Sequence, residues 1–177
     1  MKTLVIYESM YGNTHAIATQ IALGCQRSGD VKVVPVGEAD GQLVDWADLV
    51  VVGGPTHAHG MTSAASRKSA QEATQKPDSP LELDPDAAGP GLRDWLRDLS
   101  QVAGTPAVAF DTRVDAPAIV TGRASRGIAK RLRQHGFRMV AEPESFLVTK
   151  DNQLVEGEAG RAVEWASSVL SSVGASR

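Results

Sequence analysis

The sequence predicts a doubly wound α/β fold, with a five-stranded parallel sheet and helices on both faces. Runs typical of strands alternate with runs of helical periodicity along most of the chain, an order that favours parallel strands joined by crossover helices. One of these strand runs, Leu49–Gly53, is apolar throughout, as expected of a strand that is buried on both faces. The length of 177 residues suits one domain with a sizeable core.

The first half of the chain shows the alternation most clearly. Ile17, Ile21 and Cys25 recur at a spacing of four and mark one face of a helix that ends at Gly29. The elements predicted here are a strand over Thr3–Tyr7, a helix over Thr14–Ser28, a strand over Val31–Val36, a helix over Leu43–Ala47 and a strand over Leu49–Gly53.

The second half is less regular. A proline-rich stretch, Lys76–Gly91, reads as a loop. We expect one domain over residues 1–177, with an irregular insertion at about 61–104. The other predicted elements are a possible helix over Thr62–Lys76, a helix over Leu92–Ala103, a strand over Pro106–Phe110, a helix around Ile128 and Leu132 that ends at Gly136, a fifth strand within Phe137–Thr149 interrupted at Pro143, and a last helix over Val163–Val173.

Composition narrows the classes of function. The net charge of −3 carries no basic footprint for nucleic acid, and no apolar run approaches the roughly 18 residues of a membrane span. Since a strand already begins near Lys2, we expect no signal peptide. A single cysteine, Cys25, excludes an internal disulfide and fits a reducing compartment. We therefore expect a cytoplasmic protein.

The turn after the first strand, Ser9–Thr14, carries the strongest chemical signal. Four of its side chains can donate hydrogen bonds, and Gly12 lets the backbone approach a ligand closely. The following helix points its free N–H groups into the same turn, which favours an anion. The alternative is an ordinary helix cap by Asn13 or Thr14. The turn matches neither GxGxxG nor GxxxxGK, so it implies neither a dinucleotide nor a nucleoside triphosphate.

This turn resembles a known motif. The segment Ile6–Thr14, IYESMYGNT, is similar to the phosphate loop of flavodoxins, in which a hydroxyl residue is followed by two variable positions and Gly-Asn-Thr. The resemblance implies a flavodoxin-like fold that holds flavin mononucleotide (FMN). It implies that the FMN phosphate is bound by Ser9, Met10, Tyr11, Gly12, Asn13 and Thr14.

A second resemblance lies in the turn after the third strand, Gly53–Met61. It is similar to the Gly-x-Pro-Thr-…-Met loop of flavodoxin-like NAD(P)H:quinone oxidoreductases, but Ala58 and His59 stand where that loop has an aromatic residue. His57 and His59 are open to three interpretations: bordering the flavin, lying in solvent, or binding a metal. No Cys, Asp or Glu completes a ligand set in this loop, so we expect no metal site. The residues expected at the flavin ring are Pro55, Thr56, His57, Ala58, His59 and Gly60.

The turn after the fourth strand is the third candidate region. In flavodoxins this position lines the pyrimidine edge of the ring, which implies contacts from Asp111, Thr112 and Arg113. Arg113 is equally open to pairing with Asp111 or Asp115 on the surface. We expect Arg123 and Arg126 to be solvated. Cys25, Trp46 and Trp165 are expected to pack in the core. Trp95 is also expected to pack there, with a place near the flavin as the less favoured alternative.

Three functions follow from these resemblances. The first is an FMN-dependent electron-transfer protein that serves a redox partner protein. The second is an NAD(P)H:quinone-type oxidoreductase that takes a small quinone and NAD(P)H. The third is a flavodoxin-like domain that has no FMN and acts only in interaction. Several basic residues near the candidate turns favour an anionic reduced flavin, which argues against a strongly reducing carrier.

Overall fold

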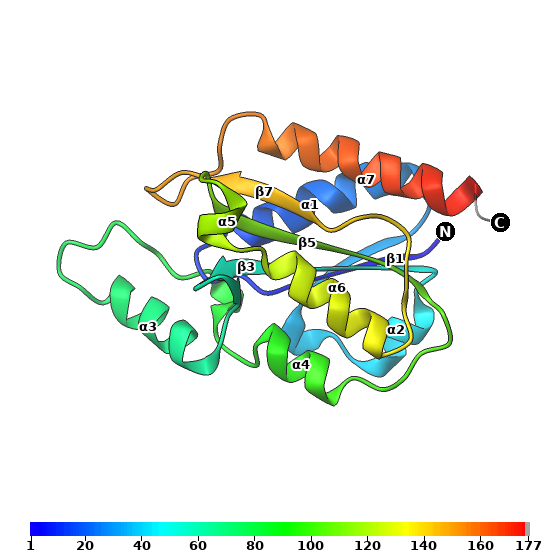
Figure 1. Cartoon of the computed structure of the whole chain (residues 1–177), viewed down its shortest axis with the longest axis horizontal. Helices are drawn as coiled ribbons and strands as arrows, with labels where there is room; N and C mark the ends of the chain where they lie inside the picture. Colours follow the sequence, from blue (N-terminus) through cyan, green and yellow to red (C-terminus); the bar gives the residue numbers. More distant parts are fainter. Residues whose placement is uncertain (176–177) are drawn as a thin grey trace.

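The structure is a computed structural model, and it describes residues 1–175 (Figure 1). Its strands are β1 (Thr3–Tyr7), β2 (Val31–Pro35), β3 (Leu49–His57), β4 (Gly60–Met61), β5 (Pro106–Val114), β6 (Arg138–Met139) and β7 (Glu144–Val148). Its α-helices are α1 (Asn13–Cys25), α2 (Gly41–Trp46), α3 (Ala64–Thr74), α4 (Leu92–Asp98), α5 (Ala118–Thr121), α6 (Ala124–Gln134) and α7 (Glu158–Ala175). Three single 3₁₀ turns are η1 (Gln26–Ser28), η2 (Val36–Glu38) and η3 (Pro85–Ala87).

The sheet confirms the predicted fold class. Its strands run in the order β2-β1-β3-β5-β6, and every neighbouring pair in this order is parallel. The fifth strand is interrupted as the sequence predicts, because β6 pairs with the start of β5 and β7 pairs with its end. The chain reverses direction across the sheet between β1 and β3, so a ligand is expected at the carboxyl ends of these two strands.

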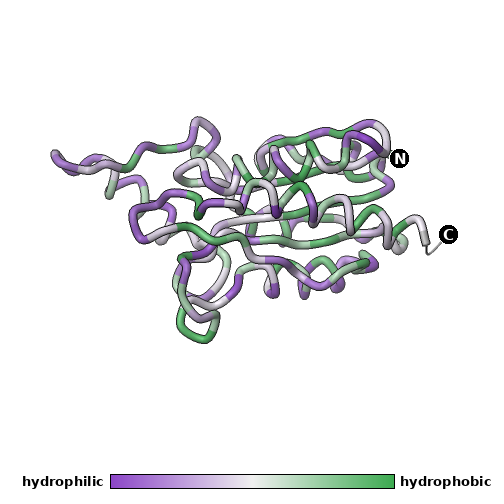
Figure 2. The backbone as a smooth tube through the Cα atoms, turned by 90° about the horizontal axis from the view of Figure 1, so that it is seen from above, coloured by the Kyte–Doolittle hydropathy of each residue, from purple (hydrophilic) through white to green (hydrophobic). Residues whose placement is uncertain are grey.

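Helices cover both faces of the sheet, with α1 and α7 on one side and α2, α4 and α6 on the other (Figure 1). Each face has its own apolar core. Cys25 lies in the core between the sheet and α1 and α7, where burial raises the pKa of its thiol to about 11. In Figure 2 apolar stretches gather in the body of the molecule, while the segment that projects farthest from it is largely hydrophilic.

Two predicted strands are longer in the structure than the sequence suggests. β3 continues past Gly53 to His57, and β5 continues past Phe110 to Val114. The two strands stay paired over this extension, since Gly53 faces Phe110 and Pro55 faces Thr112. The Phe110 ring occupies the place where a Cβ of Gly53 would lie. The glycines that suggested a turn therefore serve close packing inside the sheet.

The insertion at 61–104 is more ordered than expected. The predicted helix over Thr62–Lys76 forms as α3, and the stretch 76–91 is a loop apart from η3. The predicted helix over Leu92–Ala103 ends at Asp98, because the chain turns so that the Val102 N–H donates to the His135 carbonyl. α5 was not predicted.

Glu8, directly after β1, fastens this insertion to the sheet. Its Oε2 accepts from the Leu92 N–H at 2.7 Å, and its Oε1 accepts from the Thr62 hydroxyl. Arg93 adds bonds to the carbonyls of Met61 and Thr62. Glu8 is buried, so one carboxylate beside the candidate phosphate loop holds both the start of the insertion, at Thr62, and the start of α4, at Leu92.

Candidate functional site

The loop between β1 and α1 has the geometry of an anion site. Gly12 has a φ of 91°, a left-handed conformation that favours glycine, and it directly precedes α1. The helix has no side-chain cap, so neither Asn13 nor Thr14 satisfies its first turn. Ser9 Oγ accepts from the Gly12 N–H at 3.1 Å and holds the loop in shape. The first N–H groups of a 13-residue helix are thus left to a ligand or to water.

A cavity of about 300 Å³ opens in front of this loop. Strands β3 and β5, the turn after β7 and helix α3 form its other walls. Its lining residues are Ser9, Met10, Tyr11, Asn13, Thr14, Pro55, Thr56, His57, Thr62, Ser66, Ser69, Ala70, Ala73, Thr112, Arg113, Val114, Val148 and Asn152. Residues from all three predicted turns meet here, as the carboxyl ends of parallel strands require.

The polar wall of the cavity is organised by two side-chain pairs. The hydroxyls of Thr14 and Thr112 lie 2.7 Å apart, and both residues are buried. The Asn13 amide donates to the side-chain oxygen of Asn152 at 2.9 Å and to its carbonyl at 3.1 Å. The first pair joins the first and third candidate regions, and the second joins the phosphate loop to the turn after β7.

The second candidate region is a hairpin instead of an open turn. β4 pairs antiparallel with β3, with His57 opposite Gly60, and Ala58 and His59 form the connection with φ values of 46° and 73°. Pro55, Thr56 and His57 line the main cavity, whereas Ala58 and His59 line a neighbouring hollow of about 230 Å³.

Gly60 lines neither of these two spaces. The Thr56 side chain is fixed by the start of α6, because its Oγ1 accepts from the Ala124 N–H at 2.9 Å. Of the six residues expected at the ring, the structure therefore brings three to the main cavity and two to its edge.

Two of the three residues from β5 reach the cavity and one does not. Asp111 is fully buried beneath α6, where Oδ2 accepts from the Ser125 N–H at 2.7 Å and Oδ1 has no partner among the described residues. Burial raises the pKa of Asp111, although the bonds from Ser125 oppose this shift. Asp111 therefore caps the first turn of α6 and does not line the cavity. Its strand neighbours Thr112 and Arg113 line the cavity.

Arg113 lines both the main cavity and the neighbouring hollow. Its Nη1 donates to the Ala116 carbonyl at 2.6 Å. Within residues 1–175 it forms no ion pair with Asp111 or Asp115. The side chain therefore stays at the cavity edge and brings a positive charge there.

Arg123 and Trp95 have structural roles away from the cavity. Arg123 was expected in solvent, but its Nε donates to Ser145 Oγ at 2.9 Å and its Nη2 bonds to the Pro143 carbonyl. Arg126 is exposed, as expected. Trp95 packs in the other core and donates to the Ala39 carbonyl at 2.7 Å, so it does not line the candidate site.

Sequence reasoning missed two walls of the cavity. α3 contributes Ser66, Ser69, Ala70 and Ala73, and the Tyr11 hydroxyl donates to the Ala70 carbonyl at 3.1 Å. Asn152 comes from the turn after β7. The rule that pointed to the other three turns would have found Asn152, since its turn also follows a strand at the same sheet edge. No comparable signal marks the small residues of α3.

The flavodoxin family model matches residues 5–116, more than half of the chain. The chain belongs to the flavodoxin family. The matched residues include most of β1 and all of the phosphate loop, α3 and β5. No match was found among curated proteins.

Solved structures of flavodoxins share the fold over nearly the whole chain. A flavodoxin from the domain Archaea gives a TM-score of 0.66 at 18% identity, with 98% of this chain and 99% of that chain covered. Flavodoxin 1 from Bacillus cereus gives 0.65 at 16% identity, covering 97% and 98%. A flavodoxin, WrbA-like protein from Agrobacterium tumefaciens gives 0.61 at 17% identity, covering 99% of each chain.

The donor set fits the phosphate of a flavin nucleotide. Phosphate needs several directed N–H and O–H donors, and this flavodoxin-family loop offers an uncapped helix N-terminus beside the hydroxyls of Ser9 and Thr14. The apolar part of the cavity lies against this polar end.

No helix within residues 1–175 is long and apolar enough to cross a lipid bilayer.

Proposed function

We propose that the protein binds FMN in the cavity between the phosphate loop, β3 and β5, and works as an electron-transfer flavoprotein. The observation that carries this proposal is the uncapped start of α1, which faces a cavity lined by Ser9, Asn13 and Thr14. The phosphate would bind there, with the flavin ring against the β3–β4 hairpin. Bound FMN would supply a redox centre that exchanges one or two electrons. The chain's own residues bind and orient it.

Phosphate recognition gives the direct test. FMN and riboflavin differ only in the phosphate, so the purified protein should bind FMN more tightly, as measured by flavin fluorescence quenching. Thr14→Ala should weaken FMN binding by about 1–2 kcal/mol, between the scale of a neutral hydrogen bond and that of a bond to a charged group. Thr19→Ala is the matched control, because Thr19 is on the exposed side of the same helix. Equal affinity for FMN and riboflavin would contradict the phosphate assignment.

The partner of such a carrier would have to approach the edge of the cavity. α5 exposes Ile119 and Val120 there, with exposed fractions of 91% and 61%, and Val120 lines the adjoining hollow. Apolar side chains exposed beside a redox site suit transient docking of a redox protein. This feature favours the electron carrier among the functions considered.

A second candidate is an NAD(P)H:quinone-type oxidoreductase. The supporting observation is the apolar wall of the cavity, with Pro55, Ala70, Ala73 and Val114, which leaves a space beside His57 that α3 covers. A flat quinone suits such a wall. Steady-state oxidation of NAD(P)H by the FMN-loaded protein with a quinone acceptor distinguishes the candidates, since a plain carrier shows no turnover. A protein that binds no FMN at all would instead be an interaction domain.

A further inference from the structure

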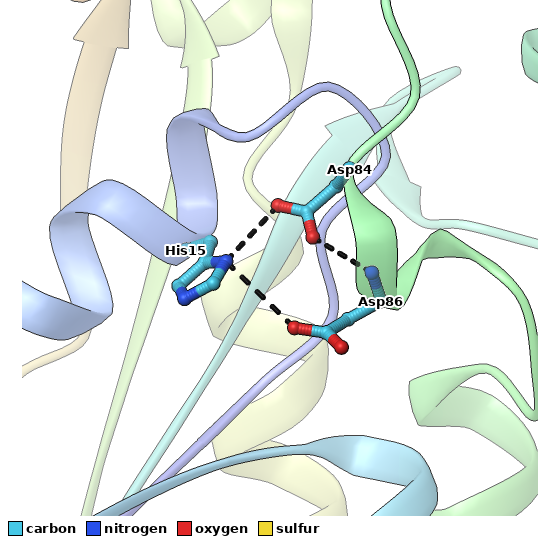
Figure 3. Close-up of side chains that lie close together, drawn as sticks. All are labelled: His15, Asp84 and Asp86. Carbon is cyan, nitrogen blue, oxygen red and sulfur yellow. Dashed lines mark hydrogen bonds and ion pairs between the residues drawn. The ribbon is translucent and has the colours of Figure 1, made fainter.

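A cluster of three ligand-type side chains lies outside the cavity, on the other side of the phosphate loop. It joins His15, in the first turn of α1, to Asp84 and Asp86, at the start of η3 (Figure 3). Their nearest atoms all lie within 4.8 Å of one another. The sequence pattern did not reveal it, because about 70 residues separate His15 from the two aspartates.

We propose that His15, Asp84 and Asp86 form a binding site for a divalent transition-metal ion of the zinc class. His15 Nδ1 faces both carboxylates, at 3.2 Å from Asp84 Oδ2 and 3.8 Å from Asp86 Oδ2. Two ligands of a tetrahedral zinc ion, each at about 2.0–2.2 Å, lie about 3.4 Å apart. The separations of 3.2 Å and 3.8 Å lie on either side of this value. One nitrogen and two carboxylate oxygens leave a fourth position for water.

Supporting hydrogen bonds hold each ligand in place. Asp84 Oδ1 accepts from the Asp86 N–H at 2.9 Å, which leaves Oδ2 directed at His15. The Tyr7 hydroxyl donates to Asp86 Oδ2 at 2.6 Å, and the Tyr7 ring stacks on His15 with 4.4 Å between centroids. Metal sites commonly use such outer bonds to orient their ligands. The three side chains are therefore arranged before any ion arrives.

Charge balance provides a separate argument. Asp84 has a side chain only 1% exposed, and across residues 1–175 neither Asp84 nor Asp86 forms an ion pair with a lysine or arginine. A buried carboxylate without a cationic partner is costly. His15 is the sole ionic partner of both within this described part of the chain, and it cannot neutralise two charges. A divalent cation can.

The site would also link two parts of the chain. The Asp84 N–H donates to the Met10 carbonyl at 2.8 Å, so the segment carrying Asp84 and Asp86 already touches the phosphate loop. An ion at this point would fasten the end of the 76–91 loop to the first turn of α1. The inference does not rest on FMN binding, because none of the three ligands lines the cavity.

The test uses Zn²⁺ and Co²⁺ on the full chain, first stripped of metal with a chelator. Calorimetry should show one Zn²⁺ per chain, and Co²⁺ should give visible absorption bands typical of low coordination number. Asp86→Asn should weaken Zn²⁺ affinity at least about tenfold, and His15→Gln should abolish the Co²⁺ bands. Asp86 is partly exposed, so its variant should remain folded, which circular dichroism in chelator checks.

The matched control is the double variant His57→Ala, His59→Ala, which removes the exposed histidines and keeps the cluster. It should bind Zn²⁺ like the parent protein. Zn²⁺ should also slow proteolysis of the 76–91 loop in the parent and in this control, but not in Asp86→Asn. Absence of stoichiometric binding, equal binding by Asp86→Asn, or loss of binding in the double-histidine variant would each overturn the proposal.

Discussion

The β1–α1 unit and the segment between β3 and β5 meet at one cavity, yet they are built differently. Every residue of β1 is buried, and α1 buries Ile17, Ile21 and Cys25 in the core beside α7. α3, in contrast, buries no residue, and α4 buries only Leu92 and Leu96. The first unit is held by apolar packing throughout, whereas the second has apolar packing through α4 and depends on polar bonds at α3. Changes in the two regions should therefore have different consequences.

Glu8→Ala should have the largest effect, because Glu8 connects the two regions. The variant loses two hydrogen bonds to a buried carboxylate and leaves the Leu92 N–H without a partner. We expect a loss of about 3 kcal/mol in the free energy of unfolding, measured by urea denaturation, with faster proteolysis between residues 62 and 92. Glu8→Gln, which keeps an acceptor for Leu92, should recover more than half of this loss. Equal losses in both variants would disprove the link.

Gly24→Ala tests the apolar side of the comparison. A Cβ at Gly24 would lie 2.5 Å from the Val163 carbonyl oxygen and 2.9 Å from Ala166 Cβ, so α1 and α7 must separate. Overpacking of this kind should cost about 2 kcal/mol in thermal or urea unfolding.

Gly160→Ala is the matched control, because it lies in α7 with open space around its Cβ position. It should be neutral or stabilise by about 0.5 kcal/mol. A Gly24→Ala protein as stable as the control would mean that the two helices are not closely packed.

The pH dependence of stability should depend on Glu158, at the start of α7. Burial alone would raise the pKa of Glu158, but bonds from Arg161 and the Leu147 N–H lower it below its ordinary 4.5. A lowered pKa in the folded state stabilises the fold above pH 4.5, and this contribution is lost as pH falls through the folded-state pKa.

Glu158→Gln should therefore cost about 1.5 kcal/mol at pH 7. The difference from the parent should shrink steadily below pH 4.5. Urea denaturation of both proteins at several pH values measures it, and a gap independent of pH would refute the electrostatic explanation.

Tyr11→Phe should have the smallest effect on global stability and a clear local one. It removes only the bond from the Tyr11 hydroxyl to the Ala70 carbonyl, which is worth about 1 kcal/mol. Hydrogen exchange in α3 should accelerate roughly fivefold, the change that 1 kcal/mol produces in an opening equilibrium. Exchange in α1 should stay as in the parent. Unchanged exchange in α3 would show that other contacts hold the helix.

The contrast between the β1–α1 unit and the segment between β3 and β5 also explains which features of the fold and the site the sequence could predict. Buried strands and amphipathic helices leave a periodic signal, so β1, α1, α6, α7 and the parallel order are readable from the chain. The phosphate loop is readable because all its residues are contiguous. The extension of β3 through Gly53 depends on contact with the Phe110 ring. The burial of Asp111 depends on its bond from Ser125 in α6. Both contacts join residues that come together only in the folded chain. The His15, Asp84 and Asp86 cluster has the same origin.

The position of Cys25 allows its thiol to report when α1 separates from α7. It is the only thiol in the chain, and it ends α1 within the core shared with α7. With its thiol buried and largely protonated at neutral pH, a thiol-specific reagent reacts only in molecules whose α1 has moved away from α7. The labelling rate in native buffer therefore measures the free energy of that motion directly, in the parent and in each variant, with no engineered probe.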